Sequence, residues 1–174
     1  VRLIELTGAY AAIGNSGRHI KPVAILCVRD GLGRIVDQHG DGCAAAAENR
    51  EVTRSSVASG RDALSPEIAY LITSILSDNE ARIPGFGQAR DMLELKGRPS
   101  AVKTGTTENT RDALTVGFTP QLATGVWVGN SDGTPMQDVT GLRGASPIWK
   151  QFMEAAHVGL QVRTWTRPPT IVIQ

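Results

Sequence analysis

The stretch Ala-Val-Lys-Thr-Gly-Thr-Thr, residues 101 to 107, places one cation, one glycine and three hydroxyls within seven positions. On a strand, Thr104 and Thr106 project from the same face, so their hydroxyls can converge on one carboxylate. Lys103 adds positive charge, and Gly105 lets a ligand or another chain approach the backbone closely. The pattern predicts the edge of a β-sheet that receives an anion.

This stretch is the first of three predicted strands, at residues 100–107, 112–118 and 121–129. Short connections predict that neighbouring strands are antiparallel. Trp127 stands between two valines, which predicts that the last strand is covered on both faces. A dense group of turn-forming residues at 130–135 predicts a surface loop.

Apolar residues at helical spacing predict a first helix over residues 1–14. Ser65-Pro66-Glu67 is a typical helix start, with an N-cap hydroxyl, a proline in the first turn and an acid near the positive end of the dipole. That helix is predicted to reach about residue 76. Its buried stripe is expected to comprise Ile68, Leu71, Ile72, Ile75 and Leu76.

Ser146-Pro147 repeats the helix-start pattern and predicts a closing helix over 146–158, with Trp149 and Phe152 in the core. Between the second helix and the sheet, residues 80–99 contain several glycines and prolines and are predicted to be irregular, with Met92, Leu93 and Leu95 packed on the body. The expected fold is therefore an antiparallel sheet with helices packed on its faces, an α+β arrangement within the α/β class.

Two short β-type runs, at residues 23–28 and 34–37, flank a turn and predict a hairpin. Residues 38–63 are rich in glycine, alanine and serine and are predicted to be mostly loop. Cys27 and Cys43 could form a disulfide or stay as two thiols, because pairing cannot be inferred from sequence. His39 and Cys43 lack the further ligands that a metal site needs. Ser55-Ser56 has no partner base nearby.

The chain has 174 residues, with 18 basic and 17 acidic side chains and a net charge of +1. The basic residues are scattered, so nucleic acid is not an expected partner. No apolar run is long enough to predict a membrane span. Because the sequence opens inside an apolar helical pattern without an initiator methionine or signal peptide, we expect it to be cut from a longer chain.

Lys103-Thr104-Gly105 is the third element of the S-x-x-K, S-D/x-N, K-T-G set of penicillin-binding proteins and serine β-lactamases. Together with its surroundings, it resembles the transpeptidase domain of class A (bifunctional) penicillin-binding proteins, in its C-terminal half. The other segments that carry the resemblance are residues 5–10, 21–23, 75–79, 81–87, 111–112, 116–120, 125–130 and 140–145. The family often has an aromatic residue at the position of Ala113-Leu114, where this chain has none.

The resemblance implies a serine β-lactamase/transpeptidase-like fold, incomplete in this chain, with residues 1–174 as one partial domain and 160–174 as its exit tail. It implies acyl transfer from D-Ala-D-Ala during peptidoglycan synthesis and reaction with β-lactams. Lys103 and Thr106 would be catalytic, and Lys103, Thr104, Gly105 and Thr106 would bind substrate. No cofactor or metal is expected.

The implied partners are peptidoglycan stem peptides, β-lactam antibiotics and the N-terminal half of the same domain, at the extracytoplasmic face of the bacterial plasma membrane. Ser77-Asp78-Asn79 matches the second motif, but it lies close to Lys103, so we interpret it as a helix C-terminal cap. The nucleophilic serine is expected outside this chain, because no S-x-x-K spacing is recognised within it. Arg111 and Asp112 are expected to form a turn-stabilising pair.

Two alternatives stay open. One is a hydrolase of the same fold, either a serine β-lactamase or a D,D-carboxypeptidase. The other is a non-catalytic module that keeps the fold without the nucleophile.

Overall fold

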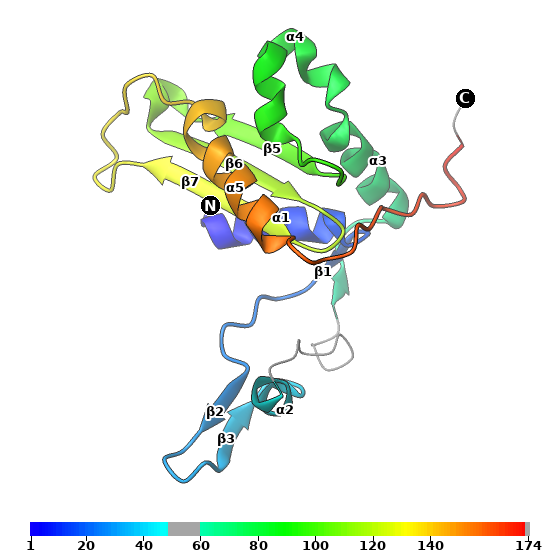
Figure 1. The fold of residues 1–174 in the computed structure, drawn as a ribbon, viewed down its shortest axis with the longest axis vertical. Coiled ribbons are helices and arrows are strands. Elements are labelled where there is room, and N and C mark those ends of the chain that lie inside the picture. Colours follow the sequence, from blue (N-terminus) through cyan, green and yellow to red (C-terminus); the bar gives the residue numbers. More distant parts are fainter. Residues whose placement is uncertain (49–59, 173–174) are drawn as a thin grey trace. The chain divides into compact units, whose positions relative to one another are not determined.

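The computed structural model describes residues 1–48 and 60–172 of the chain (Figure 1). These residues divide into two compact units, a larger one that comprises residues 1–19 and 62–172 and a smaller one that comprises residues 20–48 and 60–61. The short strands β1 (Arg18–His19) and β4 (Arg61–Asp62) stand where the chain leaves and re-enters the larger unit. The assignment of residues 1–174 to one partial domain stays a prediction.

The larger unit is built on a three-stranded antiparallel sheet with the order β5-β6-β7. Its strands are β5 (Ala101–Thr106), β6 (Asp112–Phe118) and β7 (Ala123–Gly129). The three predicted strands and their antiparallel pairing are therefore confirmed. Strand β5 pairs with β6 along its whole length, from Ala101 opposite Phe118 to Thr106 opposite Ala113.

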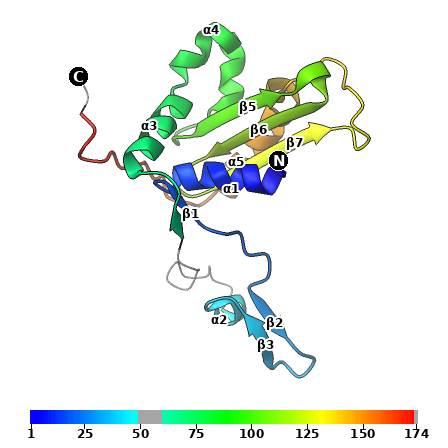
Figure 2. The same ribbon diagram turned by 180° about the vertical axis from the view of Figure 1, so that it is seen from behind.

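Helices cover both faces of this sheet, as Figures 1 and 2 show from opposite sides. Helix α1 (Leu3–Gly14) packs on β6 and β7 on one face, and α5 (Ser146–Ala156) packs on the same two strands from the other. Helix α3 (Pro66–Ser77) contacts α1 and β5. Its predicted start is confirmed, because the Ser65 hydroxyl accepts a hydrogen bond from the Ile68 N–H. The predicted fold class is confirmed.

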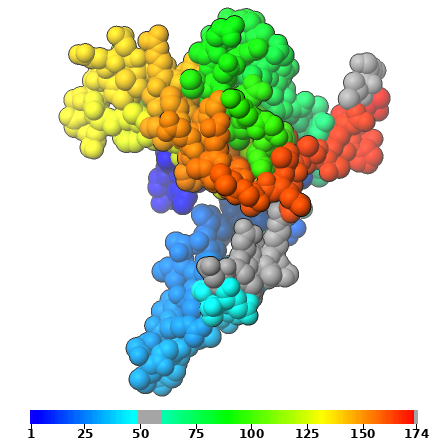
Figure 3. Space-filling view, viewed as in Figure 1, coloured from blue at the N-terminus to red at the C-terminus, as the bar shows by residue number. Residues whose placement is uncertain are grey.

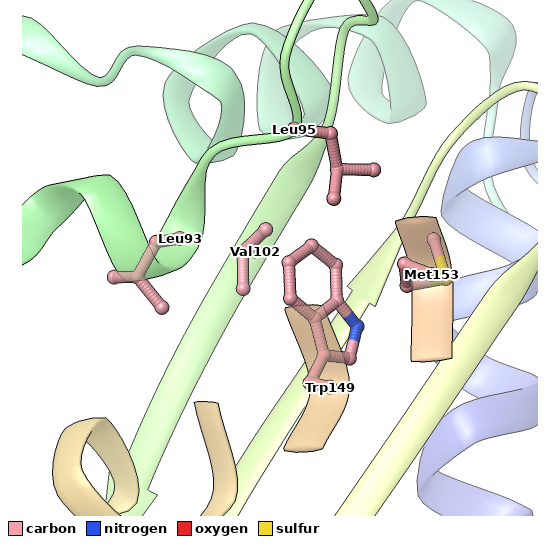
Figure 4. Close-up of a cluster of buried hydrophobic side chains, with 5 residues drawn as sticks. All are labelled: Leu93, Leu95, Val102, Trp149 and Met153. Atoms are coloured by element: carbon pink, nitrogen blue, oxygen red, sulfur yellow. The ribbon is translucent and has the colours of Figure 1, made fainter. Parts of the chain in front are cut away.

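The core between α5 and the sheet is a cluster of five buried side chains, shown in Figure 4: Leu93, Leu95, Val102, Trp149 and Met153. Trp149 is fully buried, as predicted. Its indole lies directly over Gly117 of β6, where an added Cβ would come within 2.5 Å of the ring. The absence of a side chain at residue 117 thus lets α5 approach the sheet closely.

The segment between α3 and β5 is more ordered than predicted. It forms η1 (Glu80–Arg82), α4 (Ile83–Phe86) and the 3₁₀ helix η2 (Gly87–Leu93). Leu93 and Leu95 are buried as expected, whereas Met92 is 43% exposed. In Figure 3, this segment (green) lies beside α5 (orange), and η2 contacts that helix.

Several predictions of burial were wrong. In α3 the buried side chains are those of Ala69 and Thr73. Of the predicted stripe, Ile68, Leu71 and Ile75 are exposed, and Ile72 and Leu76 are only partly buried. Small side chains face the neighbouring elements because they allow close packing, and the larger ones lie outside that contact. Phe152 of α5 is likewise 52% exposed, and Trp127 of β7 is 42% exposed although its strand was predicted to be covered on both faces.

Helix α5 does not begin with a serine cap. A π-helical turn, η4 (Gly141–Ala145), runs directly into it, so Ser146 lies inside a continuous helical segment and is fully buried. The Thr140 hydroxyl instead caps η4 by accepting from the Arg143 N–H at 3.3 Å. The predicted cap at Ser146 was therefore wrong.

In the smaller unit, β2 (Cys27–Arg29) and β3 (Ile35–Gln38) form the predicted antiparallel hairpin. Residues 38–63 were predicted to be mostly loop, but they contain helix α2 (Gly42–Ala47). A disulfide joins Cys27 to Cys43, so Cys43 offers no thiolate for a metal shared with His39. Ser55-Ser56 lies outside the described residues. Among the helices that the structure describes, none is long and apolar enough to cross a membrane.

Candidate functional site

Strand β5 changes character at its middle. Ala101 and Val102 are buried, whereas Lys103 and Thr106 are exposed and the two residues between them are partly exposed. The strand has β6 on one side only, so its other edge is unpaired within the described sheet. The predicted anion-binding residues thus lie on a free sheet edge.

Two hydrogen bonds show which backbone groups face that free edge. The Val102 carbonyl accepts from the Arg82 Nη2 at 3.2 Å, and the Thr104 carbonyl accepts from the Lys103 Nζ at 2.5 Å. Neither carbonyl therefore points at β6. Backbone groups alternate in direction along a strand, so those of Thr106 face the same free edge.

The side chains of the stretch start from two faces and meet at this edge. Thr104 and Thr106 share one face, and Lys103 starts from the opposite one. The ammonium of Lys103 nevertheless reaches the edge, because it bonds the Thr104 carbonyl. The Thr106 hydroxyl accepts a hydrogen bond from the Gly141 N–H at 3.0 Å, and the Thr104 hydroxyl has no hydrogen-bond partner within the described part of the chain.

Gly105 lies at the centre of the stretch without being required by packing. A Cβ added there would meet the Leu114 Cβ at 3.6 Å, which is ordinary van der Waals contact. The described residues therefore leave room for a small side chain at this position. Packing within the described residues therefore does not explain the glycine at this position.

Asp112 holds the end of β5 in place. One of its carboxylate oxygens accepts from the Thr107 hydroxyl at 2.9 Å, and the other accepts from the Trp127 indole N–H at 2.7 Å. These two bonds hold the pKa of Asp112 below its ordinary value, and the bond from the Trp127 indole has the larger effect. The charge of Arg111 lowers this pKa further. The predicted partner was Arg111, but the groups that bond Asp112 are Thr107 and Trp127.

Ser77-Asp78-Asn79 is occupied by local structural contacts. The Ser77 hydroxyl donates to the Ser74 carbonyl, and an Asp78 oxygen accepts from the Ala81 N–H. The Asn79 amide donates to Glu94 at 2.7 Å. These contacts agree with the interpretation of the tripeptide as a polar helix end.

Arg82 was missed by the sequence interpretation. Its guanidinium bonds the Leu76 and Val102 carbonyls and the Asn79 side chain, so it ties the end of α3 to β5. Burial lowers the pKa of Arg82, with the charges of Asp78 and Glu94 opposing the shift. No local pattern marks this residue, because its partner on β5 lies twenty positions away.

Ser100 and Lys103 also have the S-x-x-K spacing, which the sequence interpretation overlooked. Ser100 is 6% exposed and directly precedes β5. In extended chain, residues three apart project to opposite faces, whereas on a helix they share one. Ser100 is therefore not placed to act with the Lys103 ammonium as a serine–lysine pair.

A hollow in the larger unit lies away from this strand. It measures about 560 Å³ and is lined by residues of α5 and of the segment before β5, including Lys96, Arg98 and Lys150. None of residues 103–106 lines it. The candidate site is thus an open strand edge in the described chain.

We compared the chain with family models, with curated proteins and with solved structures. No family model matches the chain. Penicillin-binding protein 1A of Mycolicibacterium smegmatis is 30% identical over 181 aligned residues, which cover 98% of this chain and 20% of that protein. The chain therefore spans about a fifth of the length of the curated relatives it matches.

Solved structures agree. The crystal structure of penicillin-binding protein 1A from Haemophilus influenzae matches 99% of this chain and 28% of its own, with a TM-score of 0.76 and 26% identity. Penicillin-binding protein A from M. tuberculosis, solved as an imipenem acyl-enzyme complex, shares the fold with a TM-score of 0.60 and 22% identity over 90% of this chain and 31% of that one. By sequence and by structure, along almost its whole length, the chain matches part of the class A penicillin-binding proteins.

Proposed function

We propose that this chain is part of a peptidoglycan D,D-transpeptidase and supplies its substrate-binding strand. The observation that carries the proposal is the free edge of β5, where the Lys103 ammonium and the backbone of Thr106 face outward together. The similarity to penicillin-binding protein 1A supports it. So does the imipenem acyl-enzyme of a protein with the same fold.

The proposed reaction is acyl transfer from a stem peptide that ends in D-Ala-D-Ala. A serine attacks the carbonyl between the two alanines, the terminal D-Ala leaves, and an amine of a neighbouring stem attacks the acyl-enzyme. A β-lactam reacts with the same serine in place of the stem peptide. Lys103 attracts the terminal carboxylate and takes part in proton transfer.

The remaining residues of the strand bind and polarise the substrate. The Thr104 and Thr106 hydroxyls donate to the carboxylate. The Thr106 N–H supplies half of an oxyanion hole, a donor whose loss costs about 10²- to 10³-fold in rate. Gly105 lets the substrate lie along the free edge like an added strand.

The nucleophile of this reaction is proposed to lie outside the chain, because Ser100 is buried at the start of a strand. The second motif is placed outside as well, since Ser77-Asp78-Asn79 is engaged in helix-end contacts. Proposed partners are stem peptides, β-lactams and the part of the domain that carries the serine, at the extracytoplasmic face of the plasma membrane.

A fluorescent penicillin tests this proposal. The chain alone and the longer protein that contains it are incubated with the probe and separated by denaturing electrophoresis. We expect label on the longer protein and none on the chain alone. A labelled band from the chain alone would contradict the external nucleophile, and an unlabelled longer protein would contradict the function.

A hydrolase of the same fold would also be labelled. The two activities are separated by adding an acceptor amine to the acyl-enzyme. A transpeptidase transfers the acyl group to the amine, whereas a hydrolase releases the free acid. A non-catalytic module would show no label in either form.

A further inference from the structure

We infer that Thr115, Gly141 and Ser146 form a positioning device that presents the Thr106 hydroxyl to a carboxylate as a hydrogen-bond donor. This inference rests on the proposed function and adds residues outside the K-T-G strand to the site. Thr115 lies on β6, Gly141 is the first residue of η4, and Ser146 is the first residue of α5.

The first step concerns the polarity of the Thr106 hydroxyl. A hydroxyl has one proton to donate and two lone pairs that accept, and an ionised carboxylate can only accept. The Gly141 N–H donates to the Thr106 Oγ1 at 3.0 Å and occupies one lone pair. The hydroxyl proton then points away from Gly141, so it is available to an acceptor at the exposed end of β5.

The second step concerns the place of Gly141. An added Cβ would lie 2.5 Å from the Leu114 carbonyl oxygen and 2.6 Å from that of Gly105. Real Cβ atoms essentially never approach so closely, so only glycine fits against the paired strands β5 and β6. Its N–H is thereby held against the end of the candidate site.

The third step concerns the buried contacts of the Gly141 carbonyl. The Gly141 carbonyl lies 3.2 Å from the Thr115 hydroxyl and 3.0 Å from the Ser146 hydroxyl, and the two hydroxyl oxygens lie 2.9 Å apart. Both side chains are fully buried. The Ser146 backbone N–H also donates to this carbonyl. The two hydroxyl protons are shared among the three contacts, so either both hydroxyls donate to the carbonyl, or one does and the other donates to its neighbouring hydroxyl.

Both backbone polar groups of Gly141 are therefore engaged, the carbonyl in the core and the N–H at the site. Removal of one buried hydroxyl leaves the other hydroxyl, or the carbonyl, with fewer partners in a dry environment, which is costly. The effect reaches the Thr106 hydroxyl through the position of Gly141. Thr115 and Ser146 act on the ligand only by this route, since neither is exposed.

The experiment uses the longer transpeptidase that contains this chain and two thioester peptide substrates. One ends in a free carboxylate, and the other carries an amide at that end. The ratio of their kcat/KM values measures carboxylate preference. The variants are Thr115→Val, which removes the hydroxyl and keeps the shape, and Thr115→Ser, its matched control, which keeps the hydroxyl.

We expect Thr115→Val to lower the carboxylate preference about fivefold to tenfold, as for one hydrogen bond, with kcat/KM for the amide substrate nearly unchanged. Thr115→Ser should retain the preference. Equal losses for both substrates would overturn the inference, because a general structural defect affects them alike. Ser146→Ala gives a second, independent variant if Thr115→Val does not fold.

A double-variant cycle separates this inference from the proposed function. In a Thr106→Val background, Thr115→Val should cause no further loss of preference, because the hydroxyl it positions is gone. Additive losses would overturn the positioning role alone. If Thr106→Val itself leaves the preference unchanged, the proposed carboxylate site is wrong.

Discussion

The two halves of β5 differ in burial and in proposed role, although both pair with β6. Residues 101–102 are buried, and Val102 belongs to the cluster around Trp149, whereas residues 103–106 lie exposed or partly exposed at the free edge. Both halves pair with β6 in one continuous register. Stability and proposed function are thus separated along a single strand, so changes in one half should leave the other property nearly intact.

The largest expected effect is on the buried half. Trp149→Ala removes the fully buried indole that packs over β6 and Val102, and should lower the free energy of unfolding by about 3–5 kcal/mol. Denaturant titration of the chain measures it. Ile148→Ala, at a half-exposed position of the same helix, is the control and should cost far less. A loss under about 1 kcal/mol would mean that this cluster does not hold the sheet.

Changes in the exposed half should lower the rate of acylation and leave the free energy of unfolding nearly unchanged. In the longer protein, Lys103→Ala removes a charged donor that is worth about 1.5–3 kcal/mol, or roughly 10- to 150-fold in binding. Thr106→Val should cost less, since its N–H survives, and Thr104→Val least. The second-order rate of β-lactam acylation measures each loss, and unfolding should change little. Lys96→Ala, an exposed lysine outside the strand, is the control. A reversed order would contradict the assigned roles.

Asp112 gives a smaller, pH-dependent effect at the end of the exposed half. Its pKa is lower in the folded chain than in the unfolded one, because the Trp127 indole and the Thr107 hydroxyl bond the ionised form. The stabilising contribution is therefore present above the ordinary carboxyl pKa and is lost as pH falls through the lowered value.

The Trp127 indole proton resonance reports this titration. It should shift at a pH below the ordinary range of an aspartate, and Asp112→Asn should abolish the shift while leaving the sheet intact. A midpoint at or above the ordinary value would show that the two donors do not hold the carboxylate in solution.

Local patterns were sufficient for helices α1 and α3 and for the three strands of the sheet, but not for α2 or for the helical turns before β5. Helical spacing in residues 3–13, the cap at Ser65 and the alternation around Lys103 each depend on neighbours within a few positions, so the sequence predicts them. Trp149 was likewise predicted from its place in a bulky stripe. These features need no knowledge of which element lies beside which.

Contacts between distant residues could not be predicted in this way. Thr106 and Gly141 are 35 positions apart, and nothing in either local sequence links them. The exposure of Ile68 and Phe152 depends on which side of a helix meets the sheet, and spacing alone does not settle that. The Cys27–Cys43 bridge required a Cα separation of 4.7 Å, which only the folded hairpin and helix provide.

The smallest expected effect comes from Ser77→Ala in the longer protein, which should leave the rate of acylation by a β-lactam within a few-fold of the unmodified enzyme. The Ser77 hydroxyl donates to the Ser74 carbonyl within its own helix and is hydrogen-bonded to neither half of β5. Asn79→Ala should be compared with Ser77→Ala, because Asn79 does have an indirect connection to β5. Its side chain accepts from the Arg82 guanidinium, which also donates to the Val102 carbonyl at the junction of the two halves. A hundredfold loss from Ser77→Ala with folding intact would identify this serine as part of the active site. The division of β5 would then no longer account for the function, since a group outside the exposed half would contribute as much as Lys103.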